Sequence, residues 1–474
     1  MKVFLSLVLF CLISTIFTNN KFLPFAKEYS YGDVVDTLIN AFNATNSTFK
    51  HSAYNRTSYL VETFGPRLWG SVNLEKAIKH MYNEMVKHNF DNPRLELVPN
   101  ITNWSRGKEK LTLLSPHPTP TNIPMIGLGL SVGGNVTAEV IVVHTFDELE
   151  LVKDQVSGKI VLFNEEWTGY GSTVQYRAVG ASAAAKHGAV GCLIRSVAPV
   201  TYETPHTGSL YYTGPERIPA AAISIESALM FDHMQQRGQK IIVNLYMEAQ
   251  YGTEIKNSYN VVGEIRGTTY PEEIIVLGGH IDSWDTGPQT GANDDGAGFM
   301  VCFEVVKTLI ELNLRPKRTL RFIAWSGEEF GRDNAGSQVY MNTHKDEMKN
   351  HILAFESDLG TTRLKGFGFT GTDFARSVVK TIANTYLTRL GCTEIVEDGE
   401  SQDVNPLYTN YKVPMMNNYI DHTKNNDDYF AVHHSAADNM SVLDPDTMDD
   451  NVKGIASMLF IIADMPWALS DQNK

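Results

Sequence analysis

Hydrophobic positions recur along this chain in three successive patterns. Between residues 27 and 100, stretches with helical periodicity alternate with polar breaks. The clearest is Leu74–His88, where apolar residues stand at positions 74, 78, 81 and 85. This spacing places them on one face and predicts an amphipathic helix packed on a core.

Short β-rich runs dominate residues 120–250. An Ala-rich run, Tyr176–His187, predicts a helix among them, and the Gly- and Thr-rich segment Tyr202–Gly214 predicts an exposed loop. Because this block holds no cluster of metal-ligand residue types, we interpret it as a separate, inserted β-rich module. Its predicted strands are Ala138–His144, Lys159–Phe163, Val190–Ile194 and Lys240–Tyr246.

Strand-like and helix-like patterns alternate after residue 255. Ile274–Leu277 is a continuous apolar run, as expected for a strand covered on both faces. This order predicts an α/β fold with a mostly parallel or mixed sheet covered by helices. The other predicted elements are helices Gly296–Leu312, Thr372–Arg389 and Asp446–Met465, and strands Thr319–Trp325, His351–Phe355 and Val413–Asn417.

The length and net charge of the chain indicate its domain number and argue against one class of partner. A chain of 474 residues with 43% hydrophobic composition buries a large core and is expected to form two domains. The net charge of −14 argues against a nucleic-acid partner, because phosphate-backbone binding needs clustered Lys and Arg.

The N-terminus predicts a signal peptide over residues 1–18. Lys2 precedes the apolar run Val3–Phe17, and polar residues follow at once. The alternative is a signal anchor; no later run is long and apolar enough to span a membrane. We therefore expect a secreted chain, or one in the secretory pathway and possibly lysosomal. Glycosylation sequons support this route: Asn43, Asn46, Asn55, Asn100, Asn103, Asn135 and Asn439. Asn439 lies close to the predicted site and is expected to stay unmodified.

Cysteine usage excludes a thiolate zinc site. Cys11 falls in the signal peptide, and Cys192, Cys302 and Cys392 have no CxxC partner. One disulfide bridge remains possible. Cys302 lies in a helical apolar run and is expected to be a small buried hydrophobe.

Five separated segments carry His, Asp or Glu at places where strands end or loops begin. Since ligands of open α/β sheets bind beyond the carboxyl ends of the strands, these side chains are expected to meet. The segments are Gly278–Trp284, Gly291–Gly296, Ser326–Glu329, Glu356–Asp358 and His433–Ser435.

Two imidazoles and three carboxylates suit a pair of zinc ions, with one carboxylate bridging. A further carboxylate must take a proton from water and pass it to the leaving amine. Adjacent Glu328 and Glu329 fit this division between proton transfer and metal binding. Asp282 is expected to accept the second ring N–H of His280 and so to orient it.

Each fragment alone has a structural interpretation. Asp294-Asp295 suits a helix cap, Glu328-Glu329 a solvated loop, and His433-His434 a surface pair. All five fragments together at strand ends favour a metal site. No Gly-x-Ser-x-Gly elbow, HExxH helix or Walker loop offers another chemistry.

At these motifs the chain resembles the co-catalytic zinc exopeptidases, a family that includes bacterial leucyl aminopeptidases and glutamate carboxypeptidases. The likeness extends to Leu314–Arg321, Phe369–Gly371 and Ala463–Met465. It implies two zinc ions per chain and a general base and acid at Glu328. The implied metal ligands are the bridging Asp294, His280 and Asp358 for one zinc, and Glu329 and His434 for the other.

The resemblance also implies a cis peptide between Asp294 and Asp295, a protease-associated insert domain, a propeptide after the signal and a homodimer. Two departures from the family pattern stand out. Asn439 replaces a Thr near the last ligand, and the segment Asp421–Asp428 differs from the family and precedes that ligand.

We therefore predict a di-zinc exopeptidase that hydrolyses dipeptides or short peptides. The alternatives are a non-enzymatic binding protein on the same fold, and a metal-dependent amidohydrolase or deacylase of N-acyl amino acids. The predicted organisation is a signal peptide at 1–18, a propeptide within 19–45, catalytic segments at 46–119 and 251–474, and the inserted domain at 120–250.

Overall fold

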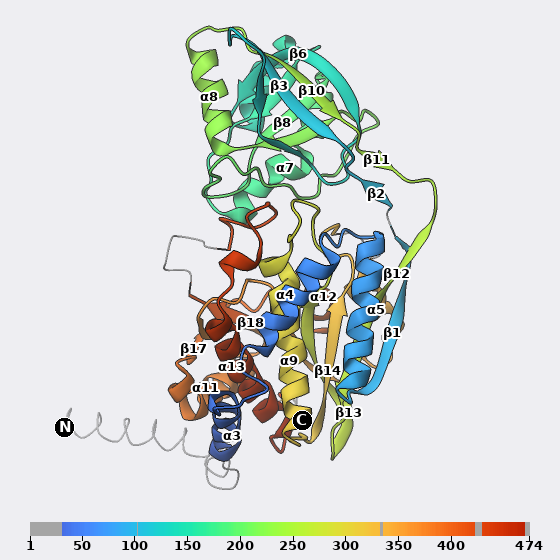
Figure 1. The fold of residues 1–474 in the computed structure, drawn as a ribbon, viewed down its shortest axis with the longest axis vertical. Coiled ribbons are helices and arrows are strands. Elements are labelled where there is room, and N and C mark those ends of the chain that lie inside the picture. Colours follow the sequence, from blue (N-terminus) through green and yellow to red (C-terminus); the bar gives the residue numbers. More distant parts are fainter. Residues whose placement is uncertain (1–30, 102, 332–334, 422–428, 470–474) are drawn as a thin grey trace, which may run out of the picture.

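The computed structural model describes residues 31–101, 103–331, 335–421 and 429–469, and folds them into two units stacked along the long axis of the molecule (Figure 1). The predicted signal peptide and residues 422–428 of the segment that departs from the family lie outside the described residues. Each unit is built on one eight-stranded sheet.

The larger unit contains a mixed sheet in the order β1-β12-β14-β13-β15-β18-β16-β17. Its four central strands, β14, β13, β15 and β18, run parallel, and antiparallel pairs flank them. This arrangement confirms the predicted helix-covered α/β fold. The strands are β1 (Asp91–Ile101), β12 (Lys256–Ile265), β13 (Tyr270–His280), β14 (Arg318–Trp325), β15 (His351–Glu356), β16 (Leu364–Thr370), β17 (Glu394–Val396) and β18 (Met415–Ile420).

Alternation along β13 explains why its apolar run is continuous. Ile275 and Leu277 pack in one core cluster with residues of α9, whereas Ile274 and Val276 pack in another with residues of α10 and α12. Both faces of the strand are therefore buried. The helices of this unit are α3 (Gly32–Asn43), α4 (Ser52–Phe64), α5 (Val72–Lys87), α9 (Ala297–Glu311), α10 (Gly336–Thr343), α11 (Asp373–Tyr386), α12 (Asn405–Tyr411) and α13 (Pro445–Asp464).

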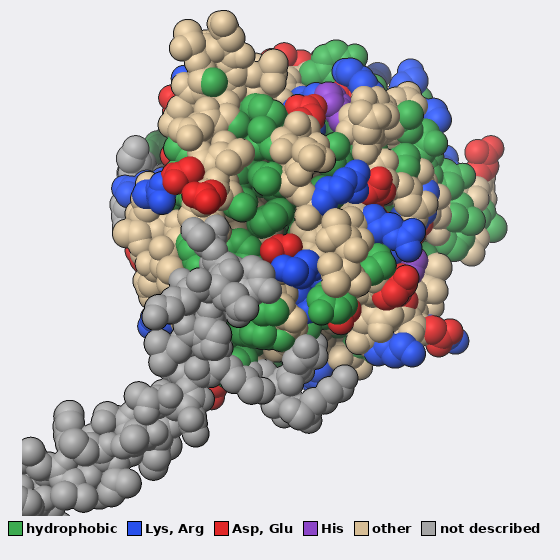
Figure 2. All heavy atoms as spheres, turned by 90° about the horizontal axis from the view of Figure 1, so that it is seen from below, with side chains coloured by type: hydrophobic (Ala, Val, Ile, Leu, Met, Phe, Trp, Pro, Cys, Tyr) green, Lys and Arg blue, Asp and Glu red, His purple; other side chains and the backbone are tan. Residues whose placement is uncertain are grey.

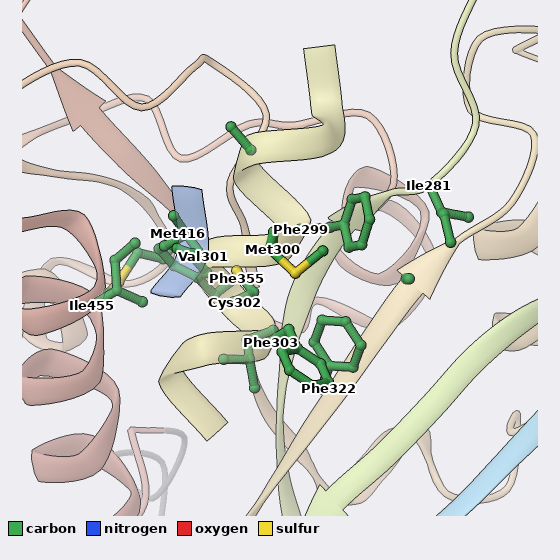
Figure 3. Packing of buried hydrophobic residues seen from close by; sticks show 14 of the residues in the cluster. Ile281, Phe299, Met300, Val301, Cys302, Phe303, Phe322, Phe355, Met416 and Ile455 are labelled. Atoms are coloured by element: carbon green, nitrogen blue, oxygen red, sulfur yellow. The ribbon is translucent and has the colours of Figure 1, made fainter. Parts of the chain in front are cut away.

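Helix α9 forms the centre of the larger core. Every residue from Ala297 to Leu309 is buried, because α4 and α13 cover the side that faces away from the sheet. Phe303 stacks on Phe90 with ring centroids 5.0 Å apart and meets Phe322 edge-on at 5.7 Å. Figure 3 shows Phe303 beside Phe322 in this packing. The predicted burial of Cys302 in the same helix is confirmed.

The smaller unit contains a second sheet in the order β4-β3-β10-β6-β7-β8-β9-β5. The chain leaves the first sheet after β1 and returns to it with β12. Helices α6 (Phe146–Leu151), α7 (Tyr170–Ala185) and α8 (Ile225–Gln236) accompany the sheet. Its strands are β3 (Glu109–Ser115), β4 (Thr121–Ile123), β5 (Met125–Gly127), β6 (Gly134–Val143), β7 (Ile160–Phe163), β8 (Gly191–Arg195), β9 (Ala220–Ile223) and β10 (Ile242–Met247).

Two boundaries in this unit differ from the prediction. The second sheet begins with β3 at Glu109 rather than at residue 120, because β3 pairs with β10 at the far end of the block. Helix α7 begins at Tyr170, before the predicted Tyr176, since its first turn packs on the larger unit through rings rather than aliphatic side chains. A two-stranded ribbon of β2 (Trp104–Ser105) and β11 (Gln250–Tyr251) joins the units (Figure 1).

Helix α3 falls inside the segment predicted as a propeptide. Its buried residues Val35, Leu38 and Phe42 join the main core, and the helix packs on α13. The propeptide boundary stays a prediction. The short helical turns are η1 (Lys153–Gln155), η2 (Ala292–Gly296), η3 (Met348–Asn350), η4 (Thr388–Leu390) and η5 (Met440–Val442).

Three further findings concern the cysteines, membrane-spanning helices and the distribution of surface charge. Cys192, Cys302 and Cys392 are free and buried, so none of them forms the possible disulfide. Among the described residues, no helix has the length and apolar character needed to cross a bilayer. On the face opposite the smaller unit, basic side chains are scattered among acidic and hydrophobic ones (Figure 2).

Candidate active site

The six predicted metal-binding and proton-transfer side chains lie together at one edge of the larger sheet. β13, β14 and β15 are parallel, so His280 and the loops after Trp325 and Glu356 emerge on the same side. Those loops carry Glu328 and Asp358. Residues far apart in sequence therefore converge as the strand-end argument predicts.

His280 forms the first half of the cluster. Its Nε2 lies 3.1 Å from Asp294 Oδ1, 3.5 Å from Asp358 Oδ1 and 3.9 Å from Glu328 Oε2. The ring is fully buried, while Glu328 and Asp358 keep a small exposed fraction where they face a cavity.

His434 forms the second half. Its Nε2 lies 2.9 Å from Glu329 Oε2 and 3.4 Å from Asp294 Oδ2. Asp294 thus presents one carboxylate oxygen to each imidazole, which is the arrangement required of a bridging ligand. The Asp294–Asp295 peptide is cis, as the family resemblance implies.

His433 is a second imidazole at the same place. Its ring stacks on that of His434 with centroids 3.5 Å apart, and its Nε2 lies 3.5 Å from Asp294 Oδ2. Of the two rings, it is His434 whose Nε2 contacts the Glu329 carboxylate. Within the described residues the geometry therefore favours His434 as the ligand that acts with Glu329.

The donor set fits divalent metal ions. Three overlapping groups each bring imidazole and carboxylate atoms within 4.8 Å of one another. The buried oxygens Asp294 Oδ2 and Asp358 Oδ1 accept no hydrogen bond, which is costly unless a cation binds them. Imidazole with carboxylate is a typical zinc donor set. The groups are His280–Asp294–Glu329, His280–Asp295–Asp358 and Asp294–His433–His434.

The pKa values of the cluster are shifted because many carboxylates are buried close together. Burial, reinforced by Asp358 and Asp294, raises the pKa of Glu328 well above its usual range. Burial and then Asp294 raise the pKa of Glu329. Burial, together with His433, lowers the pKa of His434 well below its usual range, which favours the neutral imidazole that a metal binds.

Asp282 acts differently from the prediction. The Nδ1 atom of His280 lies 3.0 Å from the backbone oxygen of Asp282 and 3.8 Å from its carboxylate. The carboxylate Oδ1 instead accepts the backbone N–H groups of Gly327 at 2.7 Å and of Glu328 at 3.3 Å. The main chain of Asp282 therefore orients the histidine, and its side chain holds the loop that carries Glu328.

Two buried side chains that the sequence analysis did not single out hold the loop of Asp294. Asp438 Oδ1 accepts the N–H of Asn293 at 2.7 Å and its Oδ2 that of Asp294 at 3.2 Å. Arg67 donates from Nε to the Ile281 carbonyl at 2.8 Å and from Nη2 to the Gly291 carbonyl at 2.8 Å. Asp438 follows the last ligand closely in sequence, whereas no local pattern marks Arg67.

The predicted exposure of the loop Tyr202–Gly214 is wrong in its middle part. His206–Leu210 are buried, because this part of the loop contacts the larger unit. Thr207 donates its N–H to the His434 carbonyl at 2.9 Å, and Ser209 Oγ donates to the Glu329 carbonyl at 2.6 Å. The smaller unit thus contacts the backbone of two predicted ligands.

A cavity of about 440 Å³ lies between the two units beside this cluster. Helix α7 of the smaller unit faces the larger unit across it (Figure 1). Rings of Tyr170 and Phe430 stack across the boundary with centroids 5.0 Å apart. The lining includes Tyr170, Arg177 and Tyr211 from the smaller unit, and Glu328, Asp358 and Phe430 from the larger one.

Comparison with known proteins places this site in a family. The sequence pattern of Peptidase family M28 matches residues 260–459 of this chain. Carboxypeptidase Q of Mus musculus is 41% identical over 440 residues, which cover 92% of this chain and 90% of that protein. The chain belongs to peptidase family M28. It is a peptide-bond hydrolase.

Solved structures agree with this assignment. A peptidase M28 precursor from Shewanella amazonensis has a TM-score of 0.84 and 29% identity, over 92% of this chain and 98% of that one. A zinc aminopeptidase from Bacillus subtilis, at 18% identity, shares the fold with a TM-score of 0.66, over 89% of this chain and 98% of that one. All six clustered residues fall within the segment matched by the M28 description, whereas Tyr170 and Arg177 fall outside it.

The role of Asp282 leads to a testable prediction. Replacing Asp282 by Ala removes the acceptor of the Gly327 and Glu328 N–H groups, and should lower kcat/KM for a peptide by roughly 10- to 100-fold. Asp282→Asn keeps an acceptor oxygen and should retain most of the activity. Steady-state kinetics with metal analysis measures both variants.

The control is Asp373→Ala, because that side chain is 98% exposed. Equal losses in Asp282→Asn and Asp282→Ala would show that the negative charge, rather than the acceptor, is what matters.

Proposed function

We propose that this chain is a di-zinc exopeptidase that hydrolyses dipeptides or short peptides with free ends. The observation that carries the proposal is the convergence of two imidazoles and four carboxylates, from five separate segments, beside one cavity that all of them except His280 line. Membership of the M28 family supports the reaction class.

The ligand roles follow from the distances within the cluster. His280 and Asp358 would hold one zinc ion, Glu329 and His434 the other, and Asp294 both. When bound, two such ions supply an activated water nucleophile and polarise the carbonyl under attack. The name of a zinc aminopeptidase with the same fold agrees with this choice of metal.

Glu328 is the residue proposed to move protons. Its side chain faces the cavity, and its backbone N–H is held by Asp282. A carboxylate whose pKa is raised by burial takes a proton readily and gives it up to a leaving amine. Glu328 would therefore serve as base in the attack and as acid in the departure of the amine.

The dimensions of the cavity support small substrates. A volume of about 440 Å³ lies within the range of small-molecule pockets and is enclosed partly by the smaller unit. The name carboxypeptidase Q, borne by relatives at about 40% identity, supports removal of C-terminal residues.

Substitution of Glu328 tests the proton-transfer role. Glu328→Gln keeps the shape of the side chain and removes its basic oxygen, so both metals should stay while kcat falls by roughly 10²- to 10⁴-fold. The measurement is steady-state hydrolysis of a dipeptide together with metal content per chain.

Glu394→Gln is the matched control, because Glu394 is exposed on β17 and away from the cavity. Unchanged turnover in Glu328→Gln would remove the assignment. Stringent chelation should abolish the activity of the wild-type chain and added zinc should restore it; full turnover without metal would remove the metal proposal.

A substrate panel separates the peptidase from the two alternative functions. Free dipeptides should be hydrolysed faster than N-acyl amino acids with the same C-terminal residue. Preference for the N-acyl compounds would assign the site to a deacylase. Binding without turnover of either class, by a chain with its metals present, would indicate a binding protein.

Maturation and assembly are further proposals. We expect cleavage of the signal near residue 18, a later propeptide cut before residue 46, secretion with possible lysosomal delivery, and a homodimer. Exposed Asn43, Asn46 and Asn55 are open to glycosylation, whereas the Asn439 amide donates to the carbonyls of Ala436 and Ala437. N-terminal sequencing and sedimentation of the chain from the medium of expressing cells test these points; a retained Met1 and a monomer would contradict them.

A further inference from the structure

A groove of about 490 Å³ lies between α4 and α5 on the larger unit. It shares no lining residue with the cavity beside the proposed metal cluster. Its lining includes Asn55 and Tyr59 of α4 and His80 of α5. Asn55 is the first residue of Asn55-Arg56-Thr57, an acceptor sequence for N-glycosylation. The proposed peptidase function uses none of these residues.

One wall of the groove is an aromatic surface. Tyr59 is 51% exposed, and its ring lies 4.9 Å from that of His80, with the two planes inclined by 34°. The ring of Phe64 lies 5.5 Å from the same histidine. Burial lowers the pKa of His80 below its usual value, so this ring is uncharged at neutral pH. An exposed aromatic surface of this kind suits a ligand that presents apolar C–H groups.

The basic side chains around the groove do not call for an anion. Arg56 forms ion pairs with Glu84 and Glu304, and Lys87 Nζ lies 3.0 Å from Glu84 Oε1. Lys50 is exposed to solvent. The groove therefore favours a neutral ligand that combines hydrogen-bonding groups with an apolar face, which describes a sugar. Its other polar lining groups are neutral: Thr48, Ser52 and Asn55.

The side chain of Asn55 is available to carry that sugar. Asn55 is exposed, and no hydrogen bond engages its side-chain amide within the part of the chain that the structure describes. Asn55 and Tyr59 are four residues apart in α4, which places their Cβ atoms about 5–6 Å apart on one face. Helical side chains lean towards the N-terminus, so the Tyr59 ring leans towards Asn55. A sugar on Asn55 Nδ2 therefore lies beside this ring.

We propose that Asn55 carries an N-linked glycan whose first N-acetylhexosamine packs against the ring of Tyr59 in this groove. The inference goes beyond the proposed peptidase function and rests on the proposed route through the secretory pathway. The donor is an oligosaccharide linked to a lipid diphosphate. A bond forms between Asn55 Nδ2 and the anomeric carbon of the first sugar, while the bond from that carbon to the phosphate oxygen breaks. The lipid diphosphate leaves, and the amide loses one proton.

The sugar must be added before α4 packs on the core. Thr57, whose hydroxyl completes the acceptor sequence, is fully buried. Its Oγ1 donates to the Ala53 carbonyl at 3.0 Å and lies 3.5 Å from the Gly296 carbonyl oxygen. The folded chain thus hides part of the sequence that has to be recognised. Attachment therefore belongs to the unfolded chain during synthesis, and the contact with Tyr59 forms on folding.

A glycan that only extended into solvent would have different consequences. Its first sugars would be as accessible on the folded chain as on the unfolded one. Loss of the Tyr59 ring would then leave this accessibility unchanged.

The experiment measures occupancy and accessibility on the chain purified from the medium of cells that make high-mannose glycans. Mass spectrometry of glycopeptides gives the occupancy of each sequon, and an endoglycosidase that cuts between the first two sugars is applied to native and unfolded chain. Cleavage at Asn55 should be roughly tenfold slower in the native chain, and Tyr59→Ser should raise the native rate by roughly three- to tenfold. Tyr59→Phe keeps the ring and should behave as the wild-type chain does.

Tyr411→Ser is the matched control, because Tyr411 is 42% exposed on α12 and does not line the groove; the rate at Asn55 should not change. Equal rates in native and unfolded wild-type chain would overturn the proposal, with no variant needed. A native rate that Tyr59→Ser leaves unchanged would also overturn it, as would an unmodified Asn55 in a chain that is glycosylated at other sequons. A chain without a glycan at any sequon would instead refute the secretory route on which the inference rests.

Discussion

Burying many carboxylates at one sheet edge is the constraint on which the rest of this site depends. Asp282, Asp294, Asp295 and Glu329 are all buried within the loops of β13, β14 and α9, and Asp358 lies beside them. Burial and the neighbouring Asp358 raise the pKa of Asp295 well above its usual range, which shows how strongly the cluster resists negative charge. A site of this kind requires cations to be stable in its ionised form.

The chain supplies part of that compensation itself. Arg67 is fully buried beneath the loops of the site. Burial lowers its pKa to about 10, and Asp438 is the acidic residue that opposes this shift most, so the guanidinium stays charged at neutral pH. Backbone N–H groups directed at Asp282 and Asp438 stabilise two further carboxylates. These contacts do not reach Asp294 Oδ2 or Asp358 Oδ1, which are left for metal ions. The same residues that neutralise the cluster also fix its geometry.

The sequence revealed the elements of the larger unit because their signals are local. A strand buried on both faces leaves a continuous apolar run, as in Ile274–Leu277, and parallel strand ends bring His280, Glu328 and Asp358 together by topology alone. The contacts that were missed are tertiary. A buried Arg such as Arg67 has the same local pattern as an exposed one, and the loop around Thr207 is buried only because another unit covers it.

The two units divide the work of the site in a way that follows from these contacts. All the proposed ligands and the proposed base lie on the larger unit, at or just after the ends of β13, β14 and β15, in the turn before α9, and in the loop that carries His434. The smaller unit contributes cavity walls, which include the buried Arg177, and the hydrogen bonds of Thr207 and Ser209 to the backbones of proposed ligands. Helix α7 therefore shapes the cavity without supplying any of the proposed metal ligands. Because the proposed ligands come from one unit and part of the cavity wall from the other, the packing of the two units against each other determines the shape of the space beside the cluster.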